Sequence, residues 1–519
     1  MSSTTFTIML PSPQPSSSPE SPEKRRCWEC QRRRLVCDSV KPVCNKCRAS
    51  GIVCPGYDDR KPLTWLAPGK VTCRTRRKGR GVDKGTGTTK IIKRTPRPKR
   101  PEEPLDSEAL AKAASRIKIG GELVFHSTLR TDICDVFEAV QYYNDVFYPY
   151  TKSGHSRKSN VFIAEIPLKV VKYLPVSIAH NLVGIAYHHR MLVQKEWKND
   201  CPSILHAQHR MHHHRGLSIR AINEDIANPK TQSSDVVLTG VILLLQSEIN
   251  ACITPHWRHH VDGLLAMLEY RGGARKWATS ATYLQAMVLS FMIVMTSANT
   301  TSPPHDQVTI CPQEEFMDLI QEFYPLGLHP HIPCPMPLFL EISRINHLRA
   351  EVSKEHEAMD KSTANVVAEE IVARIESFDG TDCDSFYENR HHRDLIASIF
   401  HSAVAVFCIS SLQSVGALPK VHRLTMLRTM HGNRLYSLME ETRNHPQVRK
   451  SVQWPLVVAG IEASVRVDKR RLVGELYLEQ AKDIATPLPM HAKNVLRTFW
   501  DGGATDWDEC FDQPYAFVS

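Results

Sequence analysis

The sequence has no long uninterrupted apolar run. Its longest, VVLTGVILLL at 236–245, has ten residues, whereas a membrane-spanning helix needs about 20. The first 26 residues are rich in Pro and Ser and have no apolar core of the kind found in secretory signals. We therefore expect no membrane association and a reducing compartment, in which clustered cysteines are metal ligands rather than disulfides.

Recognisable catalytic motifs are also missing. The sequence has no Gly-rich phosphate loop, no nucleophile elbow and no C-x2-C pair beyond residue 60. The segment HEAMD at 356–360 lacks the second histidine of a zinc-peptidase helix. We therefore expect a protein that is not an enzyme. The nine cysteines beyond residue 60 are scattered and are expected to be buried apolar residues.

Charge is distributed unevenly along the 519-residue chain. Residues 1–100 hold 24 Lys and Arg against 7 Asp and Glu, a net +17, and the rest holds 41 against 48, a net −7, which together give +10. A basic N-terminal part on a mildly acidic body is expected where one end of a protein binds a polyanion. A solubilising tail is the alternative.

Six cysteines lie in the 28 residues CWECQRRRLVCDSVKPVCNKCRASGIVC at 27–54, and their spacing repeats C-x2-C-x6-C twice. No histidine precedes His126, so a metal bound here has sulfur ligands only. Structural zinc takes four ligands in a tetrahedron. Two zinc ions therefore need eight ligand places, which six thiolates supply only if two of them bridge both ions.

Such a short segment cannot bury an apolar core, so metal binding must supply its folding free energy. Six thiolates and two zinc ions leave a net charge of −2. Nearby cations offset this charge and favour deprotonated thiols. Three alternatives remain open: a disulfide framework, a metal-buffering peptide, and a single zinc held by the two C-x2-C pairs. The last would leave Cys37 and Cys54 without a metal.

The segment resembles the fungal Zn2Cys6 binuclear-cluster DNA-binding domain, whose pattern is C-x2-C-x6-C, a spacer with proline, C-x2-C and a last cysteine. Pro42, Cys37-Asp38 and Cys54-x-Gly56-Tyr57 also match common usage in that family. The resemblance implies that Cys27 and Cys44 bridge two zinc ions. The implied zinc ligands are Cys27, Cys30, Cys37, Cys44, Cys47 and Cys54.

Three arginines stand between the second and third cysteines. We expect a short helix from Cys30 to Leu35 whose end enters the major groove, where arginine donates two hydrogen bonds to guanine O6 and N7. In the resembled family, basic residues at the positions of Arg33 and Arg34 read a CGG-type triplet, so these two are the predicted base contacts. The predicted phosphate contacts are Arg32, Lys41, Lys46 and Arg48. Alternatively, all three arginines only neutralise the cluster and bind phosphate.

Residues 58–104 are rich in Pro, Gly and basic residues, with CRTRRKGRG at 73–81 and KRTPRPKRP at 93–101. This composition predicts an extended tether. Its basic runs fit a nuclear localisation signal and also additional phosphate contacts. No a/d pattern holds over three heptads around 105–123, so no coiled-coil dimer is predicted, while a homodimer through the rest of the chain stays open.

From about residue 105 the apolar periodicity is helical. In HHVDGLLAMLEYRGG at 259–273, apolar residues recur at i, i+3, i+4 and i+7 before two glycines. No alternating strands and no repeat of fixed length occur. These patterns predict one large all-α domain. Similar apolar faces occur at 136–148, 176–194, 206–227, 235–249, 281–297, 394–407, 424–440, 451–464 and 488–500.

The all-α part resembles the fungal-specific transcription factor domain that often accompanies such a cluster. The matching stretches are YYNDVFYP at 142–149, WRHHVDGLLAMLEYRGG at 257–273 and the closing segment at 495–509. The resemblance implies a regulatory role and no catalysis. Its implied partners are a small-molecule effector and the transcription machinery.

Two further segments each have two interpretations. HAQHRMHHHRG at 206–216 places His209 and His213 four residues apart, as in metal sites, but its basic surroundings favour a solvent-exposed helix face. Aromatic and acidic residues alternate at 500–512, which fits an activation surface or, as we favour, the last packed segment of the helical domain.

The overall prediction is a small metal-stabilised Zn2Cys6 module and a large all-α regulatory domain, joined by a disordered basic linker. The predicted function is zinc-dependent, sequence-specific DNA binding that regulates RNA polymerase II transcription in the nucleus, with double-stranded DNA as partner and two zinc ions as cofactors. The alternative is a ligand-binding helical regulator whose zinc module binds DNA only weakly or non-specifically. The predicted parts are a disordered N-terminus (1–24), the zinc module (25–57), the basic linker (58–104) and the helical domain (105–519).

Overall fold

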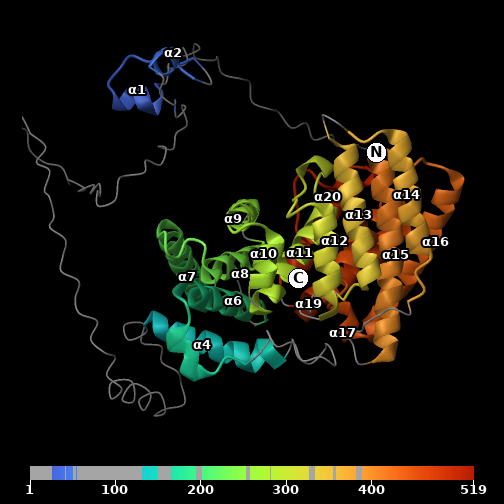
Figure 1. Cartoon of the computed structure of the whole chain (residues 1–519), viewed down its shortest axis with the longest axis horizontal. Coiled ribbons are helices and arrows are strands. Elements are labelled where there is room, and N and C mark those ends of the chain that lie inside the picture. Colours follow the sequence, from blue (N-terminus) through green and yellow to red (C-terminus); the bar gives the residue numbers. More distant parts are fainter. Residues whose placement is uncertain are drawn as a thin grey trace, which may run out of the picture. The chain divides into compact units, whose positions relative to one another are not determined.

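The computed structural model divides the chain into two compact units, residues 1–113 and 114–519 (Figure 1). The predicted disordered N-terminus and basic linker lie outside the residues that the structure describes. Those residues are 26–40, 43–50, 54, 131–149, 165–193, 202–252, 257–280, 282–326, 333–354, 358–380, 389–484 and 486–518.

In the first unit, the described residues form two short helices, α1 (Trp28–Arg32) and α2 (Asn45–Ala49). Each begins directly after a cysteine, because the sulfurs of Cys27 and Cys44 accept hydrogen bonds from the backbone N–H groups three residues later. A sulfur thus takes the place of the usual oxygen cap. The helix predicted from Cys30 to Leu35 is therefore wrong in its bounds: it begins and ends earlier in the sequence.

The second unit is helical, and its described residues contain no strand. This confirms the predicted all-α class. Its α-helices are α4 (Asp132–Tyr142), α6 (Val176–Val193), α7 (Pro202–Ala227), α8 (Asp235–Ala251), α9 (Trp257–Tyr270), α10 (Ala274–Ser280), α11 (Thr282–Thr300), α12 (Gln313–Phe323), α13 (Met336–Val352), α14 (Lys361–Glu376), α15 (Arg390–Ser414), α16 (His422–Glu441), α17 (Pro446–Arg449), α18 (Gln453–Glu462), α19 (Arg470–Ile484) and α20 (Leu488–Asp501).

Short 3-10 and π turns extend or join these helices. A π turn, η1 (Tyr143–Phe147), continues α4. The 3-10 turns are η2 (Leu168–Tyr173), η3 (Pro304–Asp306), η4 (Tyr324–Leu326), η5 (Thr442–Asn444), η6 (Val467–Lys469) and η7 (Trp507–Cys510).

Helix α9 shows how the apolar pattern produces this fold. Val261, Leu264 and Leu268 are buried, as their helical spacing predicts. The helix ends at Tyr270, and Gly272 and Gly273 follow with φ of 90° and 98°. Only glycine adopts this backbone without strain. The Gly pair therefore stops the helix as predicted.

Helix α15 is long and apolar enough to span a membrane by length and composition alone. Within its most apolar 18-residue stretch, however, 89% is buried inside this domain. Ser402, Ser410 and Ser411 interrupt the apolar side chains and are buried with them. We therefore identify α15 as the central helix of the core.

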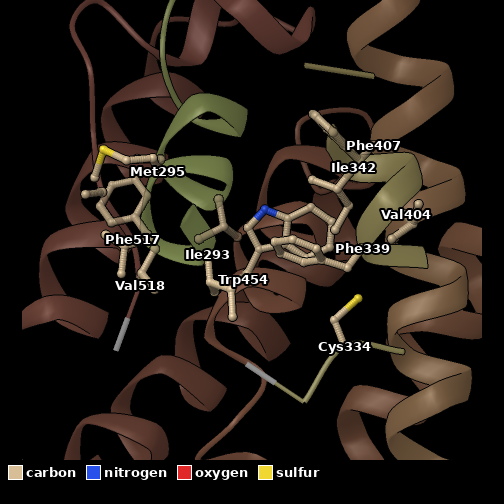
Figure 2. Packing of buried hydrophobic residues seen from close by; sticks show 14 of the residues in the cluster. Ile293, Met295, Cys334, Phe339, Ile342, Val404, Phe407, Trp454, Phe517 and Val518 are labelled. Carbon is tan, nitrogen blue, oxygen red and sulfur yellow. The ribbon is translucent and has the colours of Figure 1, made fainter. Parts of the chain in front are cut away.

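The main core extends from Ile222 of α7 to the end of the described chain. Figure 2 shows side chains from α11, α13, α15, α18 and the C-terminal segment meeting around Trp454. The Trp454 ring stacks on Phe400 at 6.1 Å between centroids, and its indole nitrogen donates to the Thr300 hydroxyl at 2.8 Å. A smaller core joins α4, η2 and α6 around Val140 and Val183.

The cysteines of this domain are partly as predicted. Three that the structure describes are buried apolar residues, and three others are half-buried. The buried ones are Cys334, Cys408 and Cys510, and the half-buried ones are Cys134, Cys252 and Cys311.

The C-terminal segment, residues 507–518, is packed into this core, which confirms the favoured interpretation of the aromatic and acidic end. Trp507, Phe511 and Phe517 are buried, and the Trp507 indole donates to the Thr300 carbonyl at 2.9 Å. The fully buried Arg349 of α13 donates to the Asp508 carboxylate and to the carbonyls of Asn299 and Ser302. An ion pair thus attaches the segment to α13.

We predict that Asp508→Ala destabilises the domain, because it leaves the Arg349 guanidinium buried without its counter-charge. Such a loss costs about 3 kcal/mol, which thermal or denaturant unfolding followed by circular dichroism would detect. The matched control is Asp501→Ala, since Asp501 is exposed at the end of α20. Equal stability of both variants would contradict the role given to Arg349.

Candidate zinc centre and DNA interface

The cysteine sulfurs of the zinc module converge on one small volume. The Cys27 Sγ–Cys44 Sγ and Cys30 Sγ–Cys44 Sγ distances are both 3.7 Å, and Cys27 Sγ–Cys47 Sγ is 3.8 Å. Zinc–sulfur bonds of about 2.3 Å in a tetrahedron place sulfurs about 3.8 Å apart. The sulfur positions therefore fit zinc coordination.

All four of these sulfurs lie within 4.8 Å of one another, and the remaining two cysteines adjoin them. Cys37 Sγ accepts a hydrogen bond from the Cys27 backbone N–H at 3.4 Å. Cys54 is half-buried and packs against the same group. The structure thus brings together all six cysteines that the sequence predicted as ligands.

Burial controls the protonation of these thiols. Desolvation raises the pKa of Cys27, Cys30 and Cys47 to about 12, so without a metal ion these thiols are protonated at neutral pH. Zinc binds thiolates and must displace these protons, so zinc affinity falls as the pH falls.

Asp38 joins the two halves of the module. Its carboxylate accepts hydrogen bonds from the Asn45 backbone N–H at 3.0 and 3.2 Å, at the N-terminus of α2. A carboxylate is favourable there because the helix dipole is positive at that end. The structural role of Asp38, which the sequence pattern only matched to family usage, is to cap α2 from the other half of the module.

The arginine triplet straddles the end of α1. The Arg34 N–H donates to the Gln31 carbonyl at 3.3 Å, and the Leu35 N–H donates to the Cys30 carbonyl at 2.9 Å. These two bonds form a Schellman motif, with Arg34 in the left-handed region at φ 58°. Arg33 is the C-cap, so both predicted base contacts lie on the turn that closes α1.

Arg32 differs from its two neighbours. Its guanidinium donates two hydrogen bonds to the Glu29 carboxylate, at 2.7 and 2.9 Å, and this pairing lowers the pKa of Glu29. Sequence reasoning missed this i, i+3 pair, although the spacing was visible. Arg33 and Arg34 are exposed, whereas Glu29 already accepts from two of the five N–H donors of Arg32.

Two of the three remaining predicted phosphate contacts lie on α2. Lys46 and Arg48 are exposed on this helix. Lys41 lies outside the described residues. Lys46 and Arg48 thus lie on α2, which begins after the first cysteine of the second C-x2-C pair. Arg32 lies on α1, the corresponding helix of the first pair.

The histidines of α7 are only partly as predicted. Their expected exposure is correct for the first three, whereas His213 is half-buried, with its Nε2 3.1 Å from the Asp132 carboxylate, and His214 is fully buried. His214 Nε2 lies 2.9 Å from the Asp135 carboxylate of α4, and Arg210 donates to the same carboxylate. The Arg210 cation contacts the same carboxylate as His214, which disfavours a metal ion there. Asp135, Arg210 and His214 therefore form an ion-pair cluster that attaches α4 to α7. The exposed histidines are His206, His209 and His212.

Comparison with known proteins agrees with this geometry. The fungal Zn(2)-Cys(6) binuclear cluster domain matches residues 25–63, and the fungal specific transcription factor domain matches residues 138–515. Together these matches define a zinc-binding, DNA-binding transcription factor. The chain belongs to the fungal transcription factors that combine these two domains.

One relative matches along almost the whole chain. The phomenoic acid biosynthesis cluster-specific transcriptional regulator of Leptosphaeria maculans is 29% identical over 506 residues, which cover 96% of this chain and 90% of that protein. No solved structure matches the chain.

Proposed function

We propose that the zinc module binds two zinc ions through its six cysteines and that Cys27 and Cys44 bridge them. The supporting observation is the set of sulfur contacts. Cys27 Sγ lies 3.7 Å from Cys44 Sγ and 3.8 Å from Cys47 Sγ, while Cys44 Sγ lies 3.7 Å from Cys30 Sγ. Each of the two proposed bridging sulfurs therefore contacts a sulfur of the other half of the module.

We predict that a fragment of residues 20–60 carries two zinc ions by native mass spectrometry. Cys44→Ser removes a ligand from both ions and should weaken the binding of both, whereas Cys54→Ser should leave one ion bound. Chelation should unfold the fragment, because no apolar core replaces the metal. A wild-type fragment with one zinc, or one that stays folded after chelation, would contradict the shared-sulfur arrangement.

We further propose that Arg33 and Arg34 read a CGG-type triplet in the major groove. Their support is position: both side chains are exposed on the turn that ends α1, and arginine is suited to the O6 and N7 edge of guanine. Lys46 and Arg48 on α2 are proposed to bind phosphates and orient the module, with Arg32 and Lys41 as further phosphate contacts. The basic runs at 73–81 and 93–101 are proposed to direct the protein to the nucleus.

Arg33→Ala and Arg34→Asn should each cost about 1–3 kcal/mol of binding to a GC-containing site and relax specificity there. Asn is chosen at 34 because it tolerates the left-handed backbone. As the control, Arg48→Ala should weaken binding evenly across sequences and reduce the salt slope by about 1. Footprinting measures the change in specificity, and titrations at several salt concentrations measure the affinity and the salt slope. If all three variants weakened DNA binding equally across sequences, Arg33 and Arg34 would not read bases. That result would favour the alternative of non-specific binding.

We also propose that the target genes form a biosynthetic gene cluster. The support is the relative from Leptosphaeria maculans, which is named for such a cluster and aligns over 96% of this chain. Genome-wide mapping of binding sites should therefore find them concentrated at promoters of adjacent genes. Sites scattered over unrelated promoters would overturn this proposal without affecting the zinc or DNA predictions.

A further inference from the structure

Two histidines and a glutamate meet at one end of the α15–α16 pair, far along the chain from the cysteines. His391 lies in the first turn of α15, Glu441 ends α16, and His445 follows η5. One ligand atom from each lies within 4.8 Å of the other two. We propose that these three residues form a binding site for a divalent transition metal, with zinc as the ion that the geometry fits.

The distances match tetrahedral coordination. His391 Nε2 lies 3.2 Å from His445 Nε2 and 3.4 Å from a Glu441 carboxylate oxygen. Zinc bonds of about 2.0–2.1 Å to nitrogen or oxygen give tetrahedral edges of about 3.3–3.4 Å. Octahedral coordination at the same bond length gives edges of about 2.8–3.0 Å, which are shorter than both observed distances, so the spacing favours four ligands. Two imidazoles and a carboxylate form a common zinc ligand set with one position left for water.

Hydrogen bonding accounts for these contacts less well than a metal does. A neutral His391 ring with its proton on Nε2 can donate to Glu441 or to His445, but that single proton cannot serve both acceptors well. If His391 Nε2 carries no proton, it can accept a hydrogen bond from His445. Its lone pair then faces the negatively charged Glu441 carboxylate, which is unfavourable. A cation at the centre of the three atoms satisfies all of them in their deprotonated forms.

The electrostatic surroundings permit a cation. Glu441 supplies a negative charge, and the adjoining C-terminus of α16 favours a cation, whereas the N-terminus of α15 disfavours one, so the two helix ends oppose each other. Of the nearby arginines, Arg443 is paired with Glu475 at 2.7 Å and Arg390 with Asp394 at 3.7 Å. The site is also open to solvent, since the His391 side chain is 56% exposed, so an ion has access.

Two other groups of the helical domain fit a metal less well. Arg210 stands among the ligand atoms of Asp132, Asp135 and His214. In the second group, His431 is buried and its Nε2 already pairs with Glu376 at 2.9 Å, beside His401. Coordination there requires a largely buried ion near Arg434, which carries a positive charge.

The test is a titration of untagged full-length protein, with its cysteine cluster already saturated with zinc, by Zn²⁺ in a calorimeter. One additional site is expected. His391→Ala and His445→Ala should each weaken that site by at least about tenfold, since even loss of a supporting residue costs this much. His422→Ala is the matched control, because His422 is exposed at the start of α16 and lies outside the site.

Cobalt identifies the ligands of the added metal. Co²⁺ bound at this site should show visible bands of nitrogen and oxygen coordination without a thiolate-to-cobalt charge-transfer band, and both histidine variants should lose these bands. Absence of an additional site would overturn the proposal, and so would an additional site that both variants keep. Neither result bears on the cysteine cluster, whose zinc is bound before the titration begins.

Discussion

Sulfur atoms that meet within 4 Å hold the zinc module together. In the described part of that module the buried residues are almost all cysteines, and the buried Glu29 is tied to Arg32. A metal therefore takes the place of an apolar core, and its loss removes the module's main source of folding free energy. The sulfurs of Cys27 and Cys44 also cap α1 and α2, so the proposed bridging ligands set the helix bounds as well.

These helix bounds determine the positions of the three arginines. Because the Cys27 sulfur caps α1, the helix starts at Trp28 and is complete by Arg32. Arg34 then takes a left-handed backbone in the closing turn, where a residue other than glycine costs on the order of 1 kcal/mol. The proposed base contacts thus lie at the end of a helix that the Cys27 sulfur caps at its start, so the proposed DNA-binding surface depends on the arrangement of the cysteines.

The helical domain is stabilised in the ordinary way, by a buried core around α15 and Trp454. Within it, polar contacts select specific partners. Arg349 joins Asp508 to α13, and Arg210 with His214 joins α4 to α7 through Asp135. Both are attachments between segments distant in sequence, and removing one partner leaves the other charge buried or partly buried without compensation.

The sequence alone was sufficient for the Zn2Cys6 domain and for the all-α class. The cysteines lie within 28 consecutive residues, and helical periodicity is a local pattern, so neither depends on distant contacts. Tertiary structure alone decided that His214 is buried, that Arg349 binds Asp508, and that His391 meets Glu441 and His445. The partners in these contacts are separated by about 50 to 200 positions along the chain, and only the packing of whole helices determines which of them meet.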